Sequence, residues 1–70
     1  MQHFETMNQL RFDKETGLHS ITEAGFKYEF PQSLFEDFKS YIFQYQFVSR
    51  WYKQLSDEDR NKVNRVSAYQ

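Results

Sequence analysis

The segment Ser33–Leu55 carries aromatic side chains on two opposite sides of a predicted helix, and this feature constrains the fold most. At 100° per residue, an apolar row falls on one side and a second, aromatic row on the other. A helix with two apolar sides must be covered twice, by its own chain or by another molecule. The first row contains Leu34, Phe38, Tyr41, Tyr45, Val48 and Tyr52, and the second contains Phe43, Phe47 and Trp51.

Three segments that precede this helix alternate apolar and polar residues, as strands with one buried face do. They begin near residue 8, at Leu18 and at Phe26, and turn residues separate them at 13–17 and 23–25. We expect an antiparallel sheet of these three strands, with residues 1–7 frayed before it. Its aromatic face should pack on the helix through Phe26, Tyr28 and Phe30 from the strand and Leu34, Phe38, Tyr41, Ile42 and Tyr45 from the helix.

A second helix is predicted after the long one. Ser56 precedes three acidic residues, and this pattern is typical of a helix N-cap followed by an acidic first turn. The helix should run from Asp57 to about Val66. The predicted fold class is therefore α+β, with a three-stranded antiparallel sheet packed on one long helix, followed by a shorter C-terminal helix, in a single domain of residues 1–70.

The composition excludes several function classes. The chain has 70 residues, no cysteine, two histidines and a formal net charge of -1. Disulfides and a metal staple are therefore excluded, and no strong field attracts nucleic acid or a membrane surface. Polar residues interrupt the densest apolar stretch, so we expect no membrane span. We expect a cytoplasmic protein without cofactor or metal.

Catalytic motifs are also missing from the sequence. No cysteine is present to act as a nucleophile, and the serines lack a nucleophile elbow. Gly17 and Gly25 lie at predicted turns and form no phosphate-binding loop. We therefore predict that the protein is not an enzyme and has no catalytic residues.

The second aromatic row has two interpretations that the sequence leaves open. In the first, the last helix, or Phe4 and Met7 near the start of the chain, covers it. In the second, Phe43, Phe47 and Trp51, with Arg50 beside them, form a surface for another protein or a second copy of the chain. A small accessory or inhibitory factor of the kind that phages and mobile elements encode would suit this second interpretation.

A nucleic-acid-binding role is the alternative hypothesis. The last predicted helix carries three basic residues and two asparagines, and Arg and Asn are side chains that read base edges. The competing interpretation is a solvated helix face that pairs locally with the acids of the first turn. The residues that would carry nucleic-acid binding are Arg60, Lys62, Asn64 and Arg65.

Overall fold

A computed structural model describes residues 9–45 and 47–68 of the chain. The expected fraying of residues 1–7 falls outside this range. The strands are β1 (Arg11–Asp13), β2 (Leu18–Glu23), β3 (Phe26–Pro31) and β4 (Asn64–Ser67). A 3-10 turn, η1 (Gln32–Leu34), leads into the helices α2 (Phe35–Tyr45), α3 (Val48–Gln54) and α4 (Asp57–Arg60). The predicted α+β class with an antiparallel sheet is confirmed.

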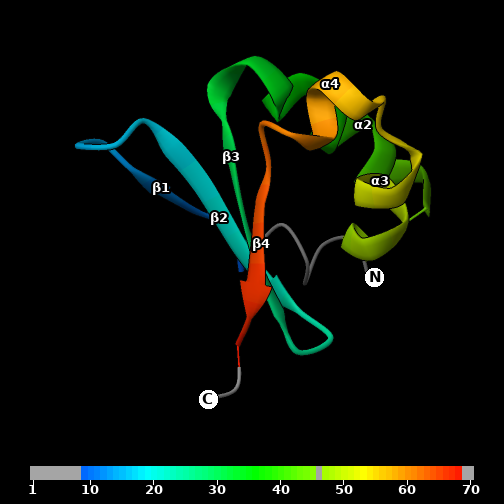
Figure 1. The fold of residues 1–70 in the computed structure, drawn as a ribbon, viewed down its shortest axis with the longest axis horizontal. Helices are drawn as coiled ribbons and strands as arrows, with labels where there is room; N and C mark the ends of the chain where they lie inside the picture. The colour runs from blue at the N-terminus through cyan, green and yellow to red at the C-terminus, as the bar shows by residue number, and fades with distance from the viewer. Residues whose placement is uncertain (1–8, 46, 69–70) are drawn as a thin grey trace.

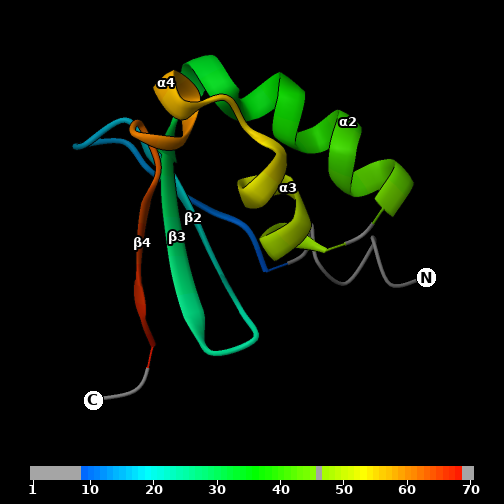
Figure 2. The ribbon, with the colours of Figure 1, turned by 45° about the vertical axis from the view of Figure 1, so that its right-hand side comes forward.

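The sheet has the order β1-β2-β3-β4, and each neighbouring pair is antiparallel. The helices lie together on one face of this sheet (Figures 1 and 2). The hairpin between β2 and β3 turns through Ala24 and Gly25, which both have positive φ, as a two-residue type I′ loop requires.

The prediction of three strands and of a helix over Asp57–Val66 is wrong, because the described chain forms a fourth strand after a single turn of α4. Ser56 caps α4 as predicted, since its hydroxyl accepts a hydrogen bond from the Asp59 amide at 3.2 Å. Val63 is then buried in the core, and Asn64–Ser67 pairs with β3. The segment 57–66 has too few apolar residues to hold a longer helix against the core. The edge of β3, by contrast, offers unpaired backbone groups with which Asn64–Ser67 can form hydrogen bonds.

The single long helix predicted over Ser33–Leu55 is also wrong, because α2 ends at Tyr45 and α3 begins at Val48. Phe47 has the extended backbone conformation φ -120°, ψ 121°, so the chain changes direction before α3. The side chains after this break therefore face different neighbours from those expected of one continuous helix.

The core lies between the sheet and the helices. At its centre the rings of Phe30, Phe38 and Trp51 meet in pairs, with centroids 4.8 to 5.0 Å apart. Trp51 also donates a hydrogen bond from Nε1 to Asp37 Oδ2 at 3.0 Å. The expected packing of β3 on the helix holds for Tyr28 and Phe30, whereas Phe26 at the end of the strand remains 37% exposed. The buried core residues are Ile21, Tyr28, Phe30, Leu34, Phe38, Ile42, Val48, Trp51, Leu55 and Val63.

Candidate functional site

The structure separates the three members of the second aromatic row. Trp51 is fully buried, whereas Phe43 and Phe47 are 71% and 54% exposed. The break after Tyr45 explains this separation, because α3 begins in a new direction and turns Trp51 toward the sheet. Trp51 therefore contributes to the core and not to the surface that Phe43 and Phe47 present.

A third aromatic side chain is exposed at the end of α2. Tyr45, the last residue of α2, is 48% exposed and stacks against Tyr41 with a centroid distance of 4.6 Å. The sequence pattern placed Tyr45 on the apolar row that was expected to be buried. Because α2 ends at Tyr45, the next turn of helix is missing, and the side chain remains exposed. We name the exposed rings of Phe43, Tyr45 and Phe47 the α2–α3 aromatic surface. It is divided, because Phe43 and Tyr45 are two residues apart and so point to different sides of α2.

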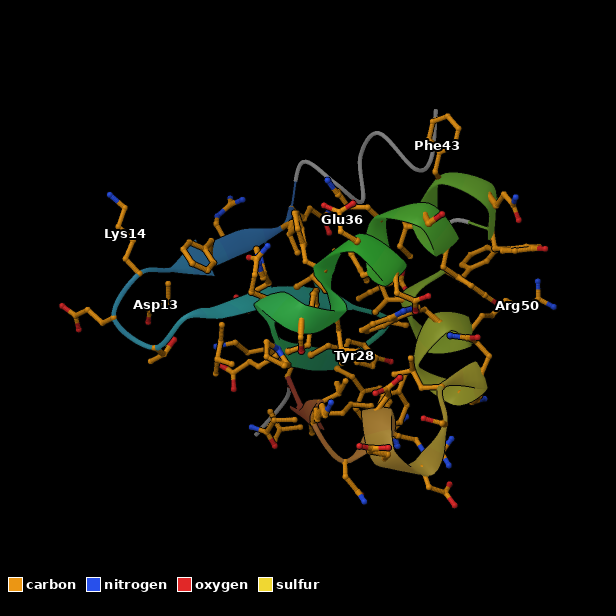
Figure 3. All side chains as sticks on the ribbon, turned by 90° about the horizontal axis from the view of Figure 1, so that it is seen from above. Asp13, Lys14, Tyr28, Glu36, Phe43 and Arg50 are labelled. Atoms are coloured by element: carbon orange, nitrogen blue, oxygen red, sulfur yellow. The ribbon has the colours of Figure 1, made fainter. Side chains whose placement is uncertain are left out.

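Polar residues lie on the same helices as the exposed rings. Arg50 is exposed on the first turn of α3, and Figure 3 shows Arg50 and Phe43 projecting outward from the helical layer. Further up α2, Lys39 forms an ion pair with Glu36 at 3.3 Å. Two open depressions on α2 run beside the exposed rings and share Ser40 and Gln44. One is lined by Glu36, Lys39, Ser40, Phe43 and Gln44, and the other by Asp37, Ser40, Tyr41, Gln44 and Tyr45.

The size of this surface can be estimated from the exposed fractions. An aromatic side chain buries about 150–250 Å², so the three exposed rings offer roughly 300–400 Å² of aromatic area. A standard protein interface buries about 800 Å² on each partner. The rings are not one contiguous patch, because Phe43 and Tyr45 point to different sides of α2, so a partner on one side would bury only part of this area.

The residues proposed for nucleic-acid binding do not form one surface. Arg60 lies on α4 and Lys62 in the turn after it, whereas Asn64 and Arg65 belong to β4, where successive side chains point to opposite faces. The Asn64 amide donates to Glu29 Oε1 on β3 at 3.1 Å. The predicted continuous basic helix face is absent from the described residues, because the helix ends at Arg60.

The basic side chains of this region also make contacts within the chain. Arg60 donates from Nη1 to the carbonyl oxygens of Lys53 and Leu55, both at 3.2 Å, and pairs with Asp57. Lys62 pairs with Asp59 at 3.7 Å. The Arg65 guanidinium lies 4.6 Å from the ring centroid of Phe26 and 4.7 Å from that of Tyr52. The Arg60 contacts join α4 to the end of α3, and the Arg65 contacts join β4 to β3 and α3, whereas the two ion pairs are local to α4 and the turn after it.

The buried histidine has a packing role. His19 on β2 stacks on Phe35 with a centroid distance of 4.1 Å, and its Nε2 lies 2.6 Å from Gln32 Oε1. Within residues 9–45 and 47–68, no group of three or more His, Cys, Asp or Glu side chains is placed to hold a metal ion. In the same part of the chain, no helix is both long and apolar enough to cross a membrane.

Comparison with known proteins gives no relative for this chain: no family model, no curated protein and no solved structure matches it. The functional argument therefore rests on the geometry of the site.

Proposed function

We propose that this chain is a small non-catalytic module that binds another protein stoichiometrically through the α2–α3 aromatic surface. The observation that carries the proposal is the exposure of Phe43 near the end of α2 and of Phe47 just before α3, while Trp51 is buried in the core. Large aromatic side chains left in water favour association, so their exposure supports a binding role. Arg50, exposed on the first turn of α3, is of a residue type enriched at binding hot spots.

The proposed role is that of an accessory or inhibitory factor, of phage or mobile-element origin, that acts by occupying a surface of its target. Such a role requires a docking face and no reacting group. The cysteine-free sequence suits a reducing compartment, and we place the action of the protein in the cytoplasm. Self-association through the same surface would use the same rings.

Nucleic-acid binding is less well supported. Arg60, Lys62, Asn64 and Arg65 each have a partner inside the chain, and contact with phosphates or bases would compete with those pairings. The formal net charge of -1 supplies no attraction to a polyanion.

The proposal is tested with the double variant Phe43→Ser, Phe47→Ser. Both side chains are exposed, so the variant should keep the circular dichroism and thermal unfolding of the parent chain. The matched control is Phe12→Ser, because Phe12 is similarly exposed, at 51%, but lies on β1. The immobilised parent and each variant are presented to lysate of the cells that produce the protein, and the captured proteins are quantified by mass spectrometry.

We expect the parent chain and Phe12→Ser to retain a protein in near one-to-one amount that the double variant loses. Sedimentation equilibrium of the same three proteins shows whether that protein is a second copy of the chain. Equal capture by the double variant and the parent would contradict the proposal.

A further inference from the structure

The strand β4 is an edge of the sheet, and no other described strand pairs with its outer side. The order β1-β2-β3-β4 makes β1 and β4 the two edge strands of the described chain. All four residues of β4 are exposed, and Figure 2 shows the strand at the margin of the fold opposite α2. The outer side of β4 is therefore accessible to a further strand.

The hydrogen-bond pattern fixes which backbone groups of β4 face outward. The Ala68 amide donates to the Gly25 carbonyl oxygen at 2.8 Å. Bonded and non-bonded positions alternate along an antiparallel pair, so the backbone groups of Val66 and Asn64 also bond to β3. The amide and carbonyl of Arg65, between those two residues, therefore point to the outer side of the sheet.

The strand β4 lacks the features by which proteins usually block an edge. Such features include prolines, lysines, bulges and very short strands. β1 is an edge strand of three residues, Arg11–Asp13, with a charged residue at each end. β4 contains no proline or lysine and pairs with β3 at four successive positions. Of the two edges, β4 is therefore the one suited to pairing with another strand.

The charges beside β4 are paired or directed away from its outer side. The Arg65 guanidinium lies over the rings of Phe26 on β3 and Tyr52 on α3, which are both on the inner side of β4. Lys27 pairs with Glu29 at 3.6 Å along β3. A two-fold interface places each residue near its own copy, where unpaired like charges would repel. The formal net charge of -1 also adds little repulsion between two copies.

Val66 offers an apolar contact at the centre of such an interface. Arg65 contacts Tyr52 on the helix side of the sheet, so Val66, the next residue, lies on the opposite face, where it is 44% exposed. A two-fold axis at Val66 makes the two Val66 side chains direct cross-strand neighbours. They occupy a non-hydrogen-bonded position, where side chains approach most closely.

We propose that two copies of the chain pair antiparallel along β4, about a two-fold axis at Val66, and join their four-stranded sheets into one. This interface is separate from the α2–α3 aromatic surface, so the inference does not depend on the proposed function. One strand pair buries less than the about 1,200 Å² of a standard interface, so we expect a weak dimer with a dissociation constant of about 0.1 mM.

The axis is tested by placing charges at Val66. Sedimentation equilibrium from about 10 µM to about 500 µM should show the parent chain passing from monomer to dimer. Val66→Lys and Val66→Glu should each weaken association about tenfold, because each brings like charges together at the axis. An equimolar mixture of the two variants should restore association, since lysine then faces glutamate.

The matched control is Phe12→Lys, because Phe12 is similarly exposed, at 51%, and lies on β1, the other edge of the sheet. It should leave association unchanged. Val66→Thr keeps the β-branched shape without a charge and should retain most of the association. Circular dichroism verifies that each variant is folded.

Amide hydrogen exchange gives a second measurement of the same interface. At rising protein concentration, exchange of the outward amide of Arg65 should slow. The amides of Asn64 and Val66 already bond to β3, so their exchange should change much less.

Three results would overturn the inference. The first is a parent chain that stays monomeric at about 500 µM. The second is association that Val66→Lys leaves unchanged and that Phe43→Ser, Phe47→Ser abolishes, because the dimer would then form through the α2–α3 aromatic surface. The third is a mixture of folded Val66→Lys and Val66→Glu chains that does not associate, because the axis would then not lie at Val66.

Discussion

The carboxylate oxygen Oε1 of Glu23 lies 2.9 Å from the backbone nitrogen of Val48 and accepts its hydrogen bond. The same oxygen lies 3.4 Å from the Ser49 nitrogen. Phe47, the residue before α3, has no polar side-chain atom that could cap the helix. The β2–β3 hairpin therefore caps α3 from a distance of 25 residues in the sequence, and this contact supports the new helix start that turns Trp51 into the core.

Removing this cap should destabilise the protein. We expect Glu23→Ala to lower the free energy of unfolding by about 1 kcal/mol, the usual loss for a helix N-cap, and Glu23→Gln to lose less because its amide oxygen still accepts. Glu15→Ala, which makes the same charge change in an exposed turn, is the control. Urea titration followed by circular dichroism measures both. Equal stability of Glu23→Ala and Glu15→Ala would show that the contact does not support α3.

Trp51 should report a buried environment, and it is the single tryptophan of the chain. We expect its fluorescence to be blue-shifted and poorly quenched by acrylamide in the native state, with both properties lost on unfolding. Trp51→Ala should cost about 3–5 kcal/mol and leave the chain largely unfolded, because a core of this size supplies little more. Phe47→Ala should leave the stability nearly unchanged. A red-shifted, readily quenched native emission would contradict the burial of Trp51.

Tyr28 carries a buried hydroxyl that has no hydrogen-bond partner among the described residues. A buried polar group without a partner costs about 1–3 kcal/mol, so Tyr28→Phe should raise the free energy of unfolding by about 1 kcal/mol. Tyr52→Phe, at a half-buried position, should change it little. Thermal and urea unfolding of the two variants provide the comparison. A loss of stability in Tyr28→Phe would mean that the hydroxyl is hydrogen-bonded in solution.

Arg65 should hold β4 in place through its contacts with the rings of Phe26 and Tyr52. We expect Arg65→Ala to lower the stability by about 1–2 kcal/mol, since each such contact contributes about 0.5–1 kcal/mol. Amide hydrogen exchange in Asn64–Ser67 should accelerate selectively. Lys62→Ala removes an exposed ion pair and should have little effect. Unchanged exchange in β4 would refute this role for Arg65.

The sequence determined those features that depend on local periodicity. Alternation of aromatic and charged residues from Phe26 to Phe30 predicted a strand with one buried face, and Tyr28 and Phe30 are buried in the observed strand Phe26–Pro31. The Ser56 cap predicted the start of α4, because N-cap chemistry involves only the next three residues. The α+β class and the antiparallel sheet follow from such patterns. The same patterns show that the segment Ser33–Leu55 has more aromatic residues than one row of a helix contains.

Only the tertiary structure decided how the aromatic residues divide between core and surface. The helical pattern is continuous from Ser33 to Leu55, and the contact of Glu23 with Val48 that supports a new helix start comes from a hairpin distant in sequence. Likewise, Asn64–Ser67 has too weak a pattern to show whether it forms helix or strand, and the open edge of β3 selects the strand. Backbone hydrogen bonds to distant segments carry no signal in local spacing, so the burial of Trp51 and the exposure of Phe43, Tyr45 and Phe47 emerge only when the chain is folded.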